Sequence, residues 1–187
     1  MKKYTLLVGL LFCTNATASV IQDHEIYTMF GAGFNNDNTQ FQFTPGFQIS
    51  NRWYLESTML FDYDIDMYSY SSNSKLNQST DSFSVSLTPL FMYPISEYFS
   101  SYAKLGGYFA KYKSTRNDES NNSLQLIEKY SKDGITFGVG RQYTTTEPTM
   151  GETMLSARLG ADWYNKGYTP KHLDKRPVIG IQIGLVF

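Results

Sequence analysis

The chain has 187 residues, and its 16 Lys and Arg nearly balance its 17 Asp and Glu, for a net charge of −1. This length suits one domain, and the lack of a dominant basic charge argues against nucleic acid as a partner. The single cysteine, Cys13, lies near the start, so neither a disulfide framework nor thiolate chemistry is predicted for an exported chain.

The first element in chain order is a predicted export signal. Lys2 and Lys3 precede an apolar run, and Ala16-Thr17-Ala18 fits the small-x-small rule for cleavage. The run, residues 6–12, is much shorter than the roughly 20 residues of a membrane-spanning helix. We therefore predict a cleaved secretory signal at 1–18 and one mature domain at 19–187.

Alternation of apolar and polar residues then predicts eight β-strands, each near the roughly 9–11 residues of a tilted membrane-crossing strand. The clearest alternation places Phe, Trp and Leu on one face and Gln, Ser and Thr on the other. It occurs in residues 40–50, 53–63 and 82–93. Weaker patterns occupy residues 24–34, 102–112, 134–143, 153–164 and 178–187. No sustained helical period is present.

The connections between the predicted strands alternate in length. Those after the second, fourth and sixth strands are short, whereas those after the third, fifth and seventh are long and polar. The long connections are residues 64–82, 113–133 and 165–176. In an up-and-down barrel this order gathers all short turns at one end, which is typical of outer-membrane barrels with periplasmic turns and extracellular loops.

Alternation alone fits a soluble lipocalin-like barrel equally well, because both barrel types have a period of two. The composition of the polar face favours the membrane barrel: Gln, Ser, Thr and Gly suit a narrow lumen better than a solvated surface. Aromatic residues near the predicted strand ends are typical of membrane-interface belts. They include Trp53, Tyr93, Tyr143 and Trp163. We predict an all-β, eight-stranded antiparallel up-and-down transmembrane β-barrel.

Three segments carry a resemblance to a known family. "YAKLGGY", "FGVGRQY" and the C-terminal Phe187 resemble small outer-membrane barrels of the OmpX and OmpA-transmembrane-domain type. The resemblance implies a place in the outer membrane of a Gram-negative bacterium, and recognition of the last strand by the barrel-assembly machinery. The outward residues of that strand are Ile179, Ile181, Ile183, Leu185 and Phe187. Leu185 and Gln182 depart from the family, which often has an aromatic and a glycine there.

Few charged residues share the polar face of the predicted strands. They are Glu56, Asp62, Lys104, Arg158 and Asp162. Because an unpaired charge is costly in a low dielectric, we expect them to pair across the lumen. A structural plug is the simpler interpretation, and a gated ion path is the alternative. Lys111 and Arg141 fall in phase with the lipid face, so we expect them to reach lipid headgroups or lipopolysaccharide phosphates.

No catalytic, cofactor-binding or metal motif is recognisable, and no cofactor is predicted. The acidic run Asp62, Asp64 and Asp66 suits a solvated hairpin better than a cation site. His24 and His172 are the only histidines; His172 with a serine from another loop would be needed for a lipid-A-modifying enzyme. The long loops are rich in Tyr, Ser and Asn, as adaptable recognition surfaces are. We therefore predict non-enzymatic action in envelope integrity or surface interaction, with a small-solute pore as the alternative.

Overall fold

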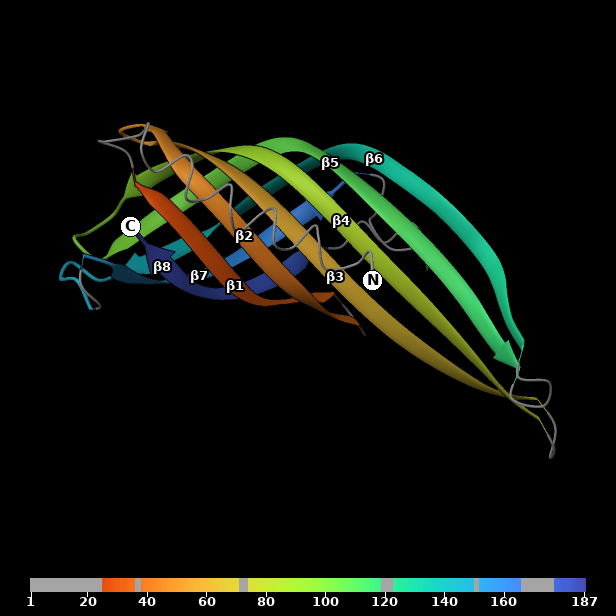
Figure 1. The fold of residues 1–187 in the computed structure, drawn as a ribbon. Coiled ribbons are helices and arrows are strands. Elements are labelled where there is room, and N and C mark those ends of the chain that lie inside the picture. Colours follow the sequence, from red (N-terminus) through yellow and green to blue (C-terminus); the bar gives the residue numbers. More distant parts are fainter. Residues whose placement is uncertain (1–24, 36–37, 71–73, 119–122, 150–151, 166–176) are drawn as a thin grey trace.

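The computed structural model describes residues 25–35, 38–70, 74–118, 123–149, 152–165 and 177–187. Eight antiparallel strands form a closed barrel in chain order, as Figure 1 shows. The strands are β1 (Ile26–Asn35), β2 (Asn38–Ser50), β3 (Trp53–Tyr70), β4 (Ser74–Pro94), β5 (Phe99–Asp118), β6 (Ser123–Thr144), β7 (Met154–Tyr164) and β8 (Val178–Val186). The predicted fold class is confirmed. Within the described residues, no helix is long and apolar enough to cross a membrane.

The barrel closes where β8 pairs with β1 as well as with β7. The β1–β8 ladder runs from Tyr27 opposite Val186 to Phe34 opposite Ile179. At its end Ile26 N–H donates to Phe187 O at 3.2 Å, and Phe187 N–H donates to Ile26 O at 2.8 Å. The hydrogen-bonding groups of both terminal strands are thereby used within the barrel, which leaves neither as an open edge there.

The two faces of each strand differ as the alternation predicts. In β8, Ile181 and Ile183 point outward and are 54% and 65% exposed, whereas Gln182 between them is buried. The outer face of the barrel is apolar, and the inner face is lined by buried Gln, Thr, Ser and Tyr with a few ions. Water-exposed strand faces normally carry charged residues. An apolar outer face with a polar inner face therefore matches a barrel surrounded by lipid.

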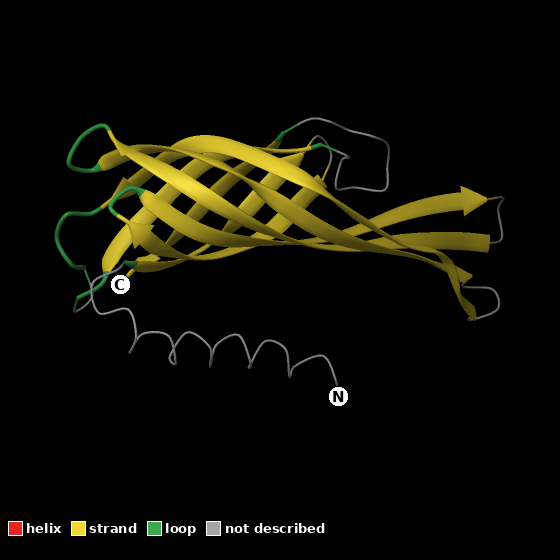
Figure 2. Ribbon diagram, turned by 90° about the horizontal axis from the view of Figure 1, so that it is seen from above, coloured by secondary structure: helices red, strands yellow, loops and turns green. Residues whose placement is uncertain are grey.

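Four strands are much longer than the others. β3, β4, β5 and β6 have 18 to 22 residues, whereas β1, β2, β7 and β8 have 9 to 13. The extra length projects beyond the barrel as a four-stranded sheet, at the end opposite the short turns (Figures 1 and 2). We call the described residues within 63–81 and 113–135 the projecting sheet.

The projecting sheet corrects the prediction of long loops at 64–82 and 113–133. β3 continues to Tyr70 and β4 starts at Ser74, so most of residues 64–82 form a paired hairpin. β5 and β6 likewise leave only residues 119–122 between them. A polar segment need not alternate in hydropathy to form strands when both of its arms find backbone partners. Of the third connection, 165–176, only Asn165 lies within the described residues.

Candidate functional site in the barrel lumen

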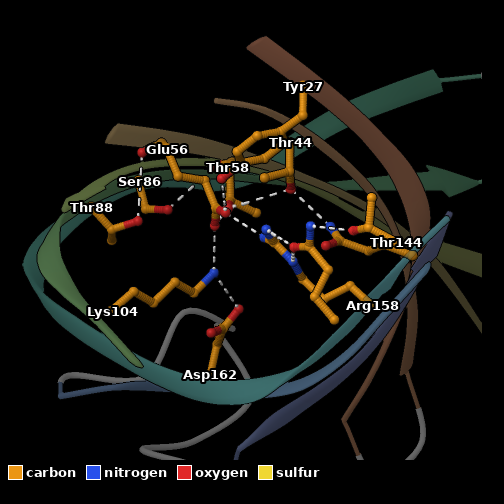
Figure 3. A network of polar contacts seen from close by, with 12 residues as sticks. Tyr27, Thr44, Glu56, Thr58, Ser86, Thr88, Lys104, Thr144, Arg158 and Asp162 are labelled. Atoms are coloured by element: carbon orange, nitrogen blue, oxygen red, sulfur yellow. Dashed lines mark hydrogen bonds and ion pairs between the residues drawn. The ribbon is translucent and has the colours of Figure 1, made fainter. Parts of the chain in front are cut away.

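An ion-pair cluster occupies the lumen near its middle. Glu56 on β3, Lys104 on β5, and Arg158 and Asp162 on β7 point inward because each has the parity of the buried face. Lys104 Nζ lies 2.8 Å from Glu56 Oε1 and 3.1 Å from Asp162 Oδ2, and Arg158 Nη1 pairs with Glu56 Oε2. Figure 3 shows these side chains, from three non-adjacent strands, meeting at the barrel axis. We call these four residues the lumen cluster.

Glu56 is the centre of the lumen cluster. Its carboxylate is fully buried and contacts both cations, and it also accepts a hydrogen bond from the Tyr27 hydroxyl at 2.8 Å. Thr58 Oγ1 donates to the same carboxylate at 3.2 Å. A buried carboxylate keeps its charge only with this degree of compensation, because removing water costs several kcal/mol per ion. One acid therefore links four strands, β1, β3, β5 and β7, across the lumen.

Arg158 is held from several sides. Its Nε and Nη2 both donate to Gln142 Oε1, at 3.1 and 2.8 Å. The guanidinium carbon lies 5.2 Å from the Tyr27 ring centroid and 4.7 Å from that of Tyr102. Sequence reasoning identified Arg158 but missed Gln142, since only its inward parity could have singled it out. Planar hydrogen bonding together with aromatic faces makes this a site for arginine rather than lysine.

Glycines make room for the lumen cluster. A Cβ on Gly138 of β6 would overlap Asp162 Oδ1 and lie 2.8 Å from Lys104 Cε. A Cβ on Gly140 would lie 2.5 Å from the Tyr102 hydroxyl, which is on the same side of the lumen. The glycines of "FGVGRQY" therefore serve close packing: they let large buried side chains lie directly against the β6 backbone.

Two groups of buried apolar and aromatic side chains flank the lumen cluster. On the short-turn side they are Tyr27, Met29, Tyr54, Leu90, Tyr102 and Val186. On the side of the projecting sheet they are Leu60, Tyr108, Ala110, Tyr112, Tyr164 and Val178. The lumen is thus filled in three layers, apolar, ionic and apolar. The sequence indicated the ionic layer, but the inward Met29, Leu60 and Leu90 were not expected.

Asp62 lies apart from the centre of the lumen cluster. It points inward on β3 and is 9% exposed, six residues beyond Glu56 towards the projecting sheet. It lies in the part of the lumen nearer the projecting sheet, where Gln40 on β2 is also buried, at 1% exposed. The side chains of Asp64 and Asp66 lie outside those described. In the described part of the chain, no group of three or more His, Cys, Asp or Glu could hold a metal ion.

The four aromatic residues predicted at the membrane interfaces all lie on the outer face. Trp53 packs against Phe91 with ring centroids 5.2 Å apart, and Tyr143 stacks on Tyr98 at 6.1 Å. Tyr93 is 55% exposed. Trp163 stacks on Phe137 at 5.0 Å, near the other end of the barrel. Rings from both ends of the barrel therefore flank the apolar band.

The outward residues of β8 form an apolar stripe beside β1. Ile179 is 41% exposed and Phe187 is 58% exposed, while Leu185 is half-buried. On the inner side, Gln182 Nε2 donates to Thr44 Oγ1 at 2.8 Å. Gln182 thus links β8 to β2 by a hydrogen bond across the lumen. Both histidines, His24 and His172, lie outside the described residues.

Comparison with known proteins places this geometry among outer-membrane barrels. The model of the OmpA-like transmembrane domain family matches residues 14–151. No curated protein matches the chain by sequence. Among solved structures, a major outer membrane protein from Thermus thermophilus is 15% identical, with a TM-score of 0.57 over 88% of this chain and 98% of that one.

Two further structures are similar. Ail, the attachment invasion locus protein of Yersinia pestis, in complex with the heparin analogue sucrose octasulfate, is 16% identical, with a TM-score of 0.52 over 88% of this chain and 98% of that one. The N-terminal β-barrel domain of Pseudomonas aeruginosa OprF is 14% identical, with a TM-score of 0.48 over 88% and 96%. At these identities the Thermus protein and Ail show a shared fold.

Proposed function

Because the chain belongs to the OmpA-like transmembrane domain family, and so to the bacterial outer membrane, we propose that it binds an extracellular partner through its projecting sheet. The observation that carries this proposal is the ordered pairing of β3 to β6 beyond the barrel. The barrel itself then serves as an anchor.

The projecting sheet offers backbone groups at its two sides. β2 pairs with β3 only as far as Phe61, and β7 pairs with β6 only from Thr136 onward. Past these points, among the described strands, β3 pairs with β4 alone and the start of β6 pairs with β5 alone. Unpaired N–H and C=O groups along a strand edge are a template for adding another strand. We infer that the partner supplies an extended peptide segment.

Shortening the hairpins tests the proposal without touching the barrel. Asp64 is directly opposite Thr80, and Lys113 is directly opposite Lys129. Replacing residues 65–79 or 114–128 with Asn-Gly therefore closes each hairpin with a two-residue turn in the same register. Both variants should still show the gel-mobility shift of a folded barrel on boiling, and should lose adhesion of expressing cells to immobilised extracellular proteins.

Adhesion that survives both deletions would contradict the proposal. The same assay should include sucrose octasulfate as a competitor, since Ail has been crystallised with that compound. Competition retained by the shortened variants would assign binding to a sulfated glycan at the barrel rim instead of to a peptide at the sheet edge.

A filled lumen opposes the alternative of a small-solute pore. Lys104 and Arg158 both contact Glu56 within the lumen, between two apolar layers. In a planar bilayer, refolded protein should give no steady conductance above the protein-free membrane. A steady single-channel current would support the pore.

We further propose that the protein is not an enzyme and that residues 1–18 are removed during export. Changing His172 to Ala should leave the acyl pattern of lipid A, measured by mass spectrometry, unchanged; an altered pattern would support lipid modification. N-terminal sequencing of the membrane form should begin at Ser19.

A further inference from the structure

Two methionines lie inside the barrel at its short-turn end. Met92 near the end of β4 and Met154 at the start of β7 point inward and are partly buried. Both pack against the apolar layer on the short-turn side of the lumen cluster. Because β4 and β7 are not neighbours in the barrel, the two side chains approach this layer from different sides. We call Met92 and Met154 the mouth methionines.

Met29 on β1 belongs to the same apolar layer but lies further from the end of the barrel. It is opposite Gly184 of β8, whereas Met154 is opposite Val186, two residues nearer the short turns. Met29 is 0% exposed, and Gly184 makes room for it, since a Cβ there would lie 2.8 Å from Met29 Cγ. Its sulfur is therefore shielded by the layer that the mouth methionines flank.

Met59 on β3 offers the opposite comparison. It is partly buried, like the mouth methionines, but it points outward, opposite Phe43 on one side and Val85 on the other. The exposed part of Met59 therefore faces lipid, whereas the mouth methionines are exposed at the end of the lumen.

The end of the lumen beside the mouth methionines is polar and open to water. In outer-membrane barrels the short turns lie on the periplasmic side. At this end the Tyr54 hydroxyl donates to the carboxylate of Glu25 at 2.9 Å, and Glu25 is exposed. Small solutes of the periplasm can therefore reach the two thioethers without crossing the apolar layer.

A thioether that meets small oxidants in water undergoes two-electron oxidation. With hydrogen peroxide, a lone pair of the sulfur attacks one peroxide oxygen and the O–O bond breaks. The second oxygen takes up the proton of the first and leaves as water, and the methionine becomes its sulfoxide. The sulfoxide oxygen is a polar hydrogen-bond acceptor, whereas the thioether sulfur accepts only weakly.

A sulfoxide oxygen beside this apolar layer finds few donors within the protein. The layer contains three tyrosines, and two of their hydroxyls already donate to carboxylates. Tyr27 donates to Glu56 at 2.8 Å. Tyr54 donates to Glu25 at 2.9 Å. Because a polar group without a partner is costly in apolar surroundings, water must enter with the new oxygen. Oxidation therefore loosens the layer that separates Glu56 from the periplasm.

We propose that Met92 and Met154 form a site of reversible oxidation by peroxides in the periplasm, and that their sulfoxides destabilise the closed lumen. Reduction reverses the step through a methionine sulfoxide reductase: a dithiol supplies two electrons and becomes a disulfide, and the sulfoxide oxygen leaves as water. The site requires only that the barrel stands in the outer membrane, so it is independent of binding at the edges of the projecting sheet.

The test treats the folded barrel in lipid vesicles with hydrogen peroxide, locates the sulfoxides by peptide mass spectrometry and measures the Tm. The mouth methionines should be oxidised on the order of tenfold faster than Met29 and Met59, since oxidation follows access to the oxidant. Their complete oxidation should lower the Tm by roughly 3–9 °C, because two new polar groups need water in an apolar layer. Methionine sulfoxide reductase with dithiothreitol should restore both the thioethers and the Tm.

Matched variants assign the fall in Tm to the mouth methionines. Changing Met92 and Met154 together to Leu keeps the volume of both side chains and should abolish the fall caused by peroxide. The control Met59→Leu should leave that fall unchanged. Met92→Gln, which places an amide oxygen where the sulfoxide oxygen forms, should lower the Tm without peroxide.

Oxidation of Met29 as fast as of the mouth methionines would overturn the site. An unchanged Tm after complete oxidation of Met92 and Met154 would overturn their effect on the lumen. A fall in Tm of the same size in the double Leu variant would overturn it as well, and would assign the loss to oxidation elsewhere in the chain.

Discussion

Lys104 and Lys113 lie on the same strand, β5, but in opposite electrostatic surroundings. Lys104 points into the lumen, where Glu56 and Asp162 lie 2.8 and 3.1 Å from its ammonium. Lys113 points outward and is directly opposite another lysine. The buried charge is compensated by the chain itself, because no solvent can do so. The exposed charge can be compensated by water, salt or a ligand. Its surroundings therefore bear on binding partners, whereas the surroundings of the buried charge bear on stability.

The largest effect should come from removing the shared carboxylate of the lumen cluster. Glu56→Gln leaves Lys104 and Arg158 without their common counter-ion, and breaking a buried ion pair from one side costs about 3–5 kcal/mol. Urea unfolding of the barrel in lipid vesicles should show this loss. The control Asp81→Asn removes an exposed carboxylate near Lys113 and should change stability by less than about 0.5 kcal/mol. Equal losses for both variants would contradict the distinction between buried and exposed charge.

A smaller effect should follow from filling the space beside the lumen cluster. The Cβ of Gly138→Ala would overlap Asp162 Oδ1, so the Lys104–Asp162 pair must move, at a cost of about 1–3 kcal/mol. Gly107→Ala is the matched control on the neighbouring strand. Its Cβ would meet only Gly134 O at 3.8 Å. In thermal unfolding in detergent, the Tm of Gly138→Ala should fall below that of the unchanged protein. The Tm of Gly107→Ala should stay within a degree or two of it.

The smallest effect on stability should come from the exposed lysine pair, Lys113 on β5 and Lys129 on β6. Lys129→Glu turns a like-charge pair opposite Lys113 into an opposite-charge pair, which should stabilise the hairpin by no more than about 0.5 kcal/mol. The gain should shrink as salt is raised from about 0.01 to 1 M, because exposed charges are screened over that range. A gain that is independent of salt would show that packing, and not charge, is responsible.

Much of the barrel could be predicted because its defining pattern is local. A period of two assigns each residue to a face, so Glu56, Lys104 and Arg158 could be placed in the lumen without knowing which strands meet there. The same period of two places Gln142, Met29 and Leu90 inward, but it does not say which inward side chains contact one another, so these three were not singled out. Residues 64–82 and 113–133 were predicted as loops, although Ile65 and Met67 alternate with Asp64 and Asp66, because polar residues predominate in the rest of both segments.

The seam between β1 and β8 has a consequence for the order of folding. Tyr27 pairs with Val186 across nearly the whole described chain, whereas β3–β4 and β5–β6 are hairpins of neighbouring strands. Loop-closure entropy and contact order both make the seam the slowest contact to form. β1 is synthesised before every other strand and receives its second partner last. Until then one edge of β1 keeps its N–H and C=O groups without their final partners in β8.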